Sequence, residues 1–458
     1  MRKLHSKLFY ILLFSFSLFF SNKTYASHME GADLKFKCLG GNLYEITLSF
    51  YRDCSGITHP TSVNINIASA SCGQNLNITA NQTSVVEASP LCAAQLSQST
   101  CNGGTLPGVQ LITYVGTVTL PMACNDWIVS WFDGSRNAAV TNLANPSSMN
   151  MYVEGRINNL NVTCNNSPDF TTPPVPYICA GVPYQYNHGV IDPEGDSLRY
   201  TMITPLSAAG TPIAYNAGFS VTTPMTMTGG LVFDPQTGQM NFTPNGTQVV
   251  AVAIRVDEYR NGILIGSVIR DMQIVVINCS NNPPTPGNVT GLVGATLSGN
   301  VFTTCPGNVM NFSIPCTDAD AGQIISTVST LTTNLPGCIV AVVGTSPTTI
   351  TVTWTVPAIP LPFYNFSITW KDNACPILGQ QTKGFLINTG PDQVITPSSY
   401  SVCPAQTVTL TAQTAGNYVW NTGATTQSIV VTPTVATSYT VTSIILGCTA
   451  KGLLLYPC

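Results

Sequence analysis

The chain has 458 residues, of which 8% are charged and 44% are hydrophobic, with 16 basic and 20 acidic side chains. Without residues 1–26, which hold four of the basic and none of the acidic residues, the net charge is −8. A weakly acidic chain this poor in Lys and Arg offers no basic surface for nucleic acid or an anionic membrane, so we expect neither as a partner. Solubility must depend on Thr, Ser, Asn and Gln, which favour strand faces and turns over long helices.

Residues 1–26 have the pattern of a secretory signal peptide. Arg2, Lys3 and Lys7 precede an apolar run over residues 8–20, and a small residue, Ala26, ends the segment. This run is shorter than the ~20 residues that cross a membrane, and no later stretch reaches that length. We therefore expect an exported protein without a transmembrane span.

The cysteine count predicts disulfides. All sixteen cysteines follow the leader, and in an exported chain a dispersed, even set without paired C-x-x-C spacings indicates disulfides rather than zinc ligands. Seven fall within residues 27–168: Cys38, Cys54, Cys72, Cys92, Cys101, Cys124 and Cys164. An odd number means that at least one has its partner elsewhere or stays free. Pairing of Cys164 with Cys179 is one geometric possibility, and the connectivity is otherwise open.

The segment 27–168 is predicted to be an N-terminal, disulfide-rich β domain. Residues 33–38 and 43–51 are expected to form a hairpin across Gly40-Gly41-Asn42, with an apolar residue at every second position from Tyr44 to Phe50. Residues 63–67, 110–120 and 127–132 are further strand candidates. We expect this hairpin to bury one of its faces.

The segment 169–280 is predicted to be a separate cadherin-like or Ig-like β-sandwich. Two long strand patterns, at about 248–259 and 263–279, flank Asn261-Gly262, which suits a two-residue turn in which both residues have positive φ. In the first of these, Val250, Val252, Ile254 and Val256 share one strand face. A second turn is expected between Asp234 and Gly238.

Several motifs, in order along the chain, resemble a known group of proteins. They are Ser27-His28-Met29-Glu30-Gly31-Ala32-Asp33, Tyr51-Arg52-Asp53-Cys54-Ser55-Gly56, Gly116-Thr117-Val118-Thr119-Leu120-Pro121, Arg136-Asn137-Ala138-Ala139, Asn166-Ser167-Pro168 and Val256-Asp257-Glu258-Tyr259-Arg260-Asn261-Gly262. Over residues 27–280 the chain resembles large secreted Bacteroidetes surface proteins, which often carry PKD or Ig-like repeats and a gliding-motility-associated C-terminal domain. The resemblance implies a β-rich, cell-surface or secreted protein exported by the type IX system, and it implies no catalytic activity.

Two further β-sandwiches are expected after the Pro-rich linker at 283–287: an Ig-like module at 281–389 and a PKD-like or Ig-like module at 390–458. The motif beginning at Cys305 recurs at Cys403, 98 residues later, which is a domain-sized repeat. Matching the two copies predicts the disulfides Cys305–Cys375 and Cys403–Cys448 and leaves Cys316–Cys338 as a local pair. Cys458 has no partner by this count, and no sorting domain precedes it, so either the C-terminal module is truncated or the protein is held at the surface by another route.

One acidic loop is a candidate calcium site. Asp192, Glu194 and Asp196 alternate around a glycine, and carboxylates in that arrangement converge on a hard cation such as Ca²⁺. The loop resembles the D-x-D-G-D loops of cadherin-like and PKD-like domains. Asp257 and Glu258, later in the same segment, are additional candidate ligands. The alternative is an acidic β-turn whose side chains accept hydrogen bonds from the local backbone. Asp318 and Asp320 form a weaker version, which we interpret as a turn.

The sequence supports three functions of different classes. The first is a non-catalytic structural or adhesion protein of gliding or surface attachment, whose β-sandwiches form a row and bind a surface polymer, glycan or protein. The second is a carbohydrate-binding module with a platform formed by Trp127 and Trp131, although these residues are expected first as core. The third is a hydrolase with its site in the N-terminal segment. No catalytic residue is predicted, because neither His59 nor His188 belongs to a recognisable motif.

Overall fold

The computed structural model describes residues 29–456 except 175, 359–360, 391–394, 398–405, 413–416, 436 and 446–447. Its regular structure is almost entirely β, and the helices are the 3₁₀ turns η1 (Ala93–Gln98), η2 (Thr100–Asn102) and η3 (Pro146–Ser148) and the single turn α2 (Leu331–Asn334). The predicted all-β class of tandem β-sandwiches is confirmed. The predicted signal peptide at 1–26 lies outside the described residues. No helix in the described part of the chain is long and apolar enough to cross a membrane.

Residues 29–280 form one unit, which we call the N-terminal body. Its strands are β1 (Met29–Gly40), β2 (Leu43–Asp53), β3 (Ser62–Ser69), β4 (Gln74–Glu87), β5 (Val109–Thr119), β6 (Trp127–Asp133), β7 (Met151–Ile157), β8 (Asp169–Phe170), β9 (Tyr177–Cys179), β10 (Tyr184–Tyr186), β11 (Val190–Ile191), β12 (Ser197–Ile203), β13 (Leu206–Ala208), β14 (Thr211–Pro212), β15 (Met227–Phe233), β16 (Met240–Pro244), β17 (Gln248–Arg260) and β18 (Ile263–Ile277). The strands expected at 33–38, 43–51, 63–67, 110–120 and 127–132 are all present.

Strand pairing crosses the predicted boundary between residues 168 and 169. One edge of β18 pairs in turn with β7 and β1, while its other edge pairs with β17. The pairings therefore close a circuit through β18, β1, β2, β5, β4, β3, β6 and β7. A single core fills this circuit and includes residues from both predicted domains, such as Phe36 and Val256. The alternation of apolar residues predicts each strand but carries no information on which distant strand will be its neighbour.

The local predictions within this body are confirmed. Tyr44, Ile46, Leu48 and Phe50 of β2 are all buried, since they point into the enclosed core. At the β17–β18 turn Asn261 and Gly262 have φ of 53° and 78°, and the flanking residues Arg260 and Ile263 are paired. The turn at residues 234–238 is also present, closed by a hydrogen bond from the Gly238 amide to the Asp234 carbonyl.

The middle module, residues 281–389, is a two-sheet sandwich. Its strands are β19 (Thr285–Pro286), β20 (Thr290–Val293), β21 (Ala295–Ser298), β22 (Val301–Thr304), β23 (Val309–Thr317), β24 (Ser326–Ser329), β25 (Ile339–Val343), β26 (Thr348–Thr355), β27 (Phe363–Lys371) and β28 (Gln380–Asn388). One sheet has the order β19-β23-β26-β25, with β20 also on β23, and the other has the order β21-β22-β28-β27-β24. Trp354, Trp370 and Phe312 lie in the core between them.

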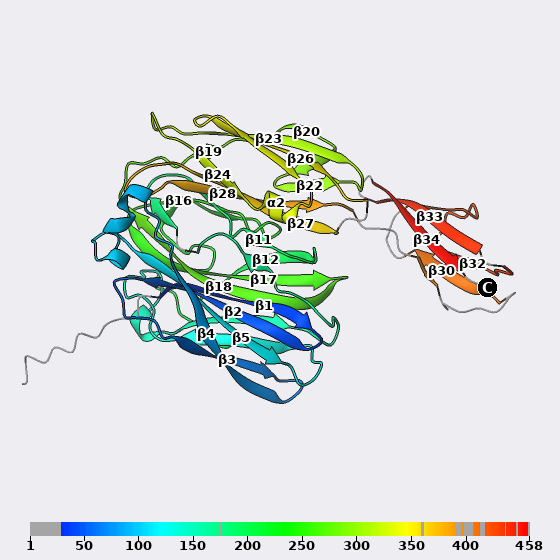
Figure 1. The fold of residues 1–458 in the computed structure, drawn as a ribbon, viewed down its shortest axis with the longest axis horizontal. Coiled ribbons are helices and arrows are strands. Elements are labelled where there is room, and N and C mark those ends of the chain that lie inside the picture. The colour runs from blue at the N-terminus through cyan, green and yellow to red at the C-terminus, as the bar shows by residue number, and fades with distance from the viewer. Residues whose placement is uncertain are drawn as a thin grey trace, which may run out of the picture.

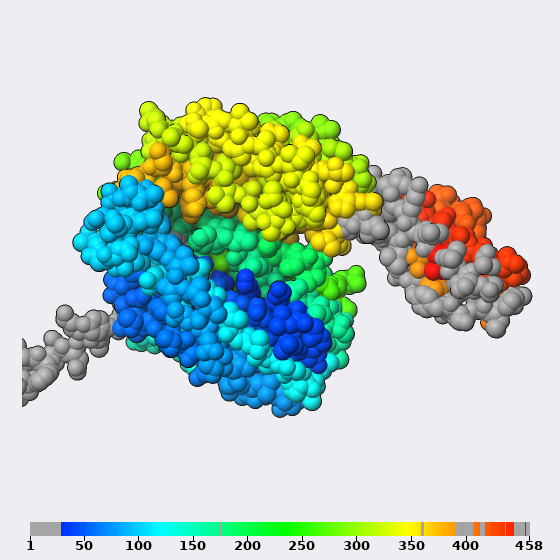
Figure 2. Space-filling view, in the orientation of Figure 1, coloured from blue at the N-terminus to red at the C-terminus, as the bar shows by residue number. Residues whose placement is uncertain are grey.

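The middle module packs along the side of the N-terminal body, so the expectation of sandwiches in a row is wrong for these two units (Figures 1 and 2). In this seam the Gln239 amide donates to the Thr382 carbonyl and its oxygen accepts from the Gly384 amide. Leu91 forms a β-bridge with Ile377. Polar groups of each unit thus find hydrogen-bond partners in the other unit. Independent domains joined by a flexible linker would not need such partners.

The C-terminal module lies to one side of the other two units in Figure 1. Its strands are β29 (Ile395–Pro397), β30 (Val408–Ala412), β31 (Asn417–Trp420), β32 (Ser428–Val431), β33 (Thr437–Ile445) and β34 (Cys448–Tyr456), in two three-stranded sheets. Val408 and Leu410 alternate into the core beside Trp420. A turn follows Trp420, with Gly423 at a φ of 85°.

Five disulfides are described. Three lie within residues 29–168: Cys38–Cys164, Cys54–Cys101 and Cys72–Cys124. Cys179–Cys279 links β9 to the chain that follows β18. The odd cysteine of the N-terminal segment is Cys92, which pairs with Cys375 across the seam. The expected outside partner therefore exists, while the suggested pairing of Cys164 with Cys179 is wrong. Such cross-links are typical of proteins that fold in an oxidising compartment.

The predicted pair Cys305–Cys375 is wrong, because Cys375 bonds Cys92, and Cys305 is oxidised with another partner. The predicted pair Cys316–Cys338 is also wrong, and both of these thiols are free. The register explains why: Cys316 lies opposite Thr348 of β26, whereas Ile339, next to Cys338, lies opposite Thr353. Five residues of strand span about 17 Å, beyond the reach of a disulfide. The predicted Cys403–Cys448 pair lies outside the described side chains.

Candidate functional site

The acidic loop predicted from the sequence forms a compact cluster with one residue of β17. Asp192, Glu194, Asp196 and Glu258 each place a carboxylate oxygen within 4.8 Å of the others. The loop connects β11 to β12, and the Asp192 Oδ1 atom accepts hydrogen bonds from the backbone amides of Glu194 (3.1 Å) and Asp196 (2.8 Å). Gly195, with a φ of 72°, allows the chain to turn back between them. The local sequence thus directs three carboxylates to one point.

The fourth member of the cluster is Glu258 and not Asp257, which corrects the predicted ligand set. Successive residues of a strand point to opposite faces, so only one of these neighbours can face the loop. Glu258 is completely buried there, opposite Leu198 of β12. Asp257 points away and accepts two hydrogen bonds from the Arg255 guanidinium, at 2.9 and 3.0 Å.

A small set of donors surrounds the carboxylates. The Arg260 guanidinium donates to both oxygens of Asp196, and its second partner is the Asn165 Oδ1 atom at 2.9 Å. The Asn165 amide donates to both Glu258 oxygens, at 2.9 and 2.8 Å. The Asn166 amide donates to Glu194. In the described structure one guanidinium therefore accompanies four carboxylates, which leaves an excess of negative charge.

The pKa values reflect this excess. Burial, and then the charges of Asp196 and Glu194, raise the pKa of Asp192 from 3.8 to about 6. Burial is also the main cause that raises the pKa of Glu194, and the pKa of Glu258 is raised well above 4.5 by burial and by the charges of Asp192 and Asp196. Without a further cation, the cluster must hold protons or bear repulsion between like charges.

The cluster fits a hard cation. The Asp192 Oδ2 and Glu194 Oε2 atoms are buried and accept no hydrogen bond in the described structure, so they are free to coordinate. Carboxylate oxygens are the ligands that Ca²⁺ prefers. Gly266 makes room for this arrangement, because a Cβ atom at that position would lie 2.3 Å from the Glu258 Oε2 atom.

The cluster lies beside the seam with the middle module. A Cβ atom on Gly195 would lie 2.5 Å from the Leu361 Cβ atom and 2.9 Å from the Phe363 carbonyl oxygen. A cavity of about 420 Å³ adjoins this contact and is lined by both units, including Asp196 and Arg260 from the body and Phe363 and Asn388 from the module. The acidic loop is therefore both a charge cluster and a contact between two units.

The weaker acidic pair behaves as a turn. The Asp318 Oδ1 atom accepts from the Asp320 amide at 2.8 Å. Both oxygens of Asp320 accept from Asn282, one from its backbone amide and one from its side chain. The two hydrogen bonds from Asn282 lower the pKa of Asp320. They also attach the start of the linker to this loop, as expected of a structural turn.

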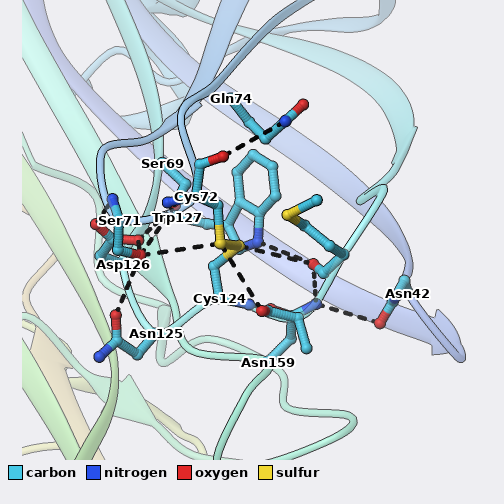
Figure 3. The surroundings of a disulfide bond; sticks show 12 residues. Asn42, Ser69, Ser71, Cys72, Gln74, Cys124, Asn125, Asp126, Trp127 and Asn159 are labelled. Carbon is cyan, nitrogen blue, oxygen red and sulfur yellow. Dashed lines mark hydrogen bonds between the residues drawn. A yellow bond between two sulfur atoms is a disulfide. The ribbon is translucent and has the colours of Figure 1, made fainter.

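The prediction of a carbohydrate-binding platform on Trp127 and Trp131 is wrong. Trp127 and Trp131 share a strand face, as expected, but that face points inward and the two side chains are 0% and 4% exposed. Figure 3 shows Trp127 beside the Cys72–Cys124 disulfide, where its indole N–H donates to the Met122 carbonyl oxygen at 3.4 Å. Neither ring can stack on a carbohydrate from solvent.

Outside the acidic cluster, Asp126, Asp169 and His188 have structural surroundings. Asp126 accepts hydrogen bonds from Ser69 and Ser71 (Figure 3), and Asp169 pairs with Lys35 at 2.9 Å. His188 is completely buried, and burial, followed by the charge of Arg270, lowers its pKa well below 6.5. His188 is therefore neutral at physiological pH.

Two buried ion pairs were missed by the sequence analysis. Arg136 pairs with Asp271 and Arg270 with Asp33, and all four side chains are at most 5% exposed. Arg270 also lies over the Phe170 ring at 4.1 Å. The available signal was that Asp33 and Arg136 belong to the motifs of the family resemblance, as do Asn166, Glu258 and Arg260 of the acidic cluster.

Comparison with known proteins identifies no family. No family model matches the chain, and no curated protein matches it. Among solved structures, the three-Ig ectodomain of mouse nectin-like molecule 4 aligns with 62% of this chain and 96% of its own length, at 10% identity and a TM-score of 0.24. The ICAM-5 D1–D4 ectodomain fragment aligns with 93% of this chain and 97% of its own, at 11% identity and a TM-score of 0.22. Human protocadherin-24 EC1-2 aligns with 49% and 97%, at 16% identity and a TM-score of 0.17. At TM-scores this low, the alignments carry no argument about function.

Proposed function

We propose that this chain is a non-catalytic, exported surface protein that presents binding surfaces on a rigid β-sandwich scaffold, in attachment or gliding. The observation that carries the proposal is the seam between the N-terminal body and the middle module. The Cys92–Cys375 disulfide crosses this seam, and the Gln239 side chain forms hydrogen bonds across it with the backbone of Thr382 and Gly384. A scaffold that must hold its binding loops in place outside the cell gains from such cross-linking, since a disulfide restricts the unfolded chain and survives oxidising conditions.

Ca²⁺ bound to Asp192, Glu194, Asp196 and Glu258 is part of this proposal. The cation would neutralise the carboxylates, which otherwise must bind protons or repel one another. It would also stiffen the loop that contacts Leu361. Its effect on stability follows from mass action: a hundredfold excess of Ca²⁺ over the dissociation constant stabilises the folded protein by about 2.7 kcal/mol. The melting temperature of the purified protein in 1 mM Ca²⁺ should therefore exceed that in EGTA.

The matched variants make this test specific. Asp192→Asn keeps an oxygen for the two loop amides and removes the charge, so we expect it to abolish the Ca²⁺ response. Asp257→Asn, one residue from Glu258 but paired with Arg255 on the opposite face, should retain it. If all three proteins respond alike to Ca²⁺, or none responds, the cluster is an acidic turn without a cation.

The non-catalytic role is tested separately. Purified protein is incubated with a panel of glycans and peptides, and both turnover and saturable binding are measured. We expect binding without turnover. Hydrolysis that disappears after a single Asp or Glu substitution would refute the proposal and would support the hydrolase instead.

A further inference from the structure

β25 (Ile339–Val343) ends one sheet of the middle module, and in the described structure no strand pairs with its outer edge. Its side chains are Ile339, Val340, Ala341, Val342 and Val343, and the first and last are 68% and 70% exposed. An edge strand normally carries a charge, a proline or a bulge that prevents another strand from pairing with it. β25 has none of these, and its register against β26 is continuous over all five residues.

The surroundings of β25 also lack charge. No charged residue occurs between Asp320 and Lys371, a stretch that contains β24, β25 and β26. A charged partner would find no counter-charge along this edge, whereas two copies of it can approach without repulsion. The charge pattern therefore favours a partner that is as neutral as β25 itself.

The order of side chains matches a second copy. If two β25 strands pair antiparallel about a twofold axis at Ala341, Ile339 lies opposite Val343 of the partner and Val340 lies opposite Val342. Residues 339, 341 and 343 share the outer face, so exposed side chains meet exposed side chains. Pairs of β-branched residues opposite each other stabilise antiparallel strands. The strand β25 can therefore pair with a second copy of itself with all five residues in register and with the exposed side chains of both copies on the same face of the sheet.

We propose that β25 is a self-association edge, through which two copies of this chain join their middle modules into one continuous sheet. The expected affinity is weak. The paired strands are only about 17 Å long, and a stable dimer usually buries at least about 1,200 Å² in total. Association would become effective where many copies are held close together, because tethering raises the effective concentration. This inference goes beyond the proposed display role and does not depend on Ca²⁺.

The test is sedimentation equilibrium of the full chain over a range of concentrations. Wild-type protein should show reversible, concentration-dependent dimerisation. Ala341→Lys places two ammonium groups opposite each other at the axis and should weaken dimerisation at least tenfold. Val309→Lys, an exposed position of β23 away from the edge, is the matched control and should dimerise like the wild type.

A charge-swap experiment separates edge pairing from loss of folding. Ala341→Lys and Ala341→Glu should each be monomeric, and an equimolar mixture should form a heterodimer because the two charges face each other. Melting temperatures of both variants report that they are folded. A wild type that stays monomeric at every concentration, or a mixture that does not associate, overturns the proposal.

Discussion

The buried ion pair between Arg136 and Asp271 offers the sharpest test of what holds the N-terminal body together. Both side chains are 1% exposed, and the guanidinium donates to both oxygens of Asp271. It also donates to the carbonyl oxygens of Asn150 (3.0 Å) and Leu206 (3.1 Å). One side chain therefore fixes the loop before β7, the strand β13 and the central strand β18. We choose Arg136→Met, which keeps the apolar stem and removes the charge.

This substitution leaves the Asp271 carboxylate buried without its counter-charge. Breaking a buried pair in this way costs about 3–5 kcal/mol, because the remaining charge has lost its hydration and gained nothing. The control is Lys35→Met, which breaks the Lys35–Asp169 pair, whose side chains are 39% and 35% exposed. An exposed pair of this kind contributes less than about 1 kcal/mol. Equilibrium unfolding in guanidinium chloride, followed by tryptophan fluorescence with the disulfides intact, measures both losses.

The double variant Arg136→Met with Asp271→Leu completes the experiment. Removing both charges relieves the unpaired carboxylate, so the double variant should be more stable than Arg136→Met alone. If Arg136→Met loses no more than Lys35→Met, burial of the pair does not govern its energetics. If the double variant is less stable than the single one, the backbone carbonyl contacts of Arg136 outweigh the charge pairing.

Three further predictions follow from the seam and the acidic cluster. Gly195→Ala should destabilise the protein by about 1–3 kcal/mol in chemical unfolding, since the residue has positive φ and its Cβ atom would overlap Leu361. An unchanged unfolding midpoint would show that Leu361 and its neighbours move aside at little cost. Cys92→Ser should cost about 2–4 kcal/mol and make the middle module more sensitive to limited proteolysis, because Cys375 no longer holds it; equal proteolysis rates would contradict this. The third prediction concerns pH in the presence of EGTA. The stability contributed by protonated Asp192 is fully present below pH 3.8 and is lost as the pH rises through about 6. The melting temperature of Asp192→Asn should therefore fall less over this range than that of the wild type.

Much of the local structure could be predicted because it depends on neighbouring residues. Alternation from Tyr44 to Phe50 identified a strand with a buried face, and Asn261-Gly262 identified a turn that needs two positive φ angles. The acidic loop was also found, since Asp192, Glu194 and Asp196 are close in sequence and turn about Gly195. Each of these features is decided within about ten residues.

The remaining features depend on residues that are far apart in the chain. Whether Asp257 or Glu258 joins the acidic loop is decided by which face of β17 meets β12. Disulfide partners likewise depend on which strands lie side by side, so that Cys92 bonds Cys375 across 283 residues. By itself the sequence determined an all-β, cysteine-rich chain with one acidic loop, because these properties follow from composition and from the two-residue period of a strand. Only the tertiary structure decided that two predicted domains share one core and that a third packs against them, because pairing between distant strands is set by the burial of whole faces.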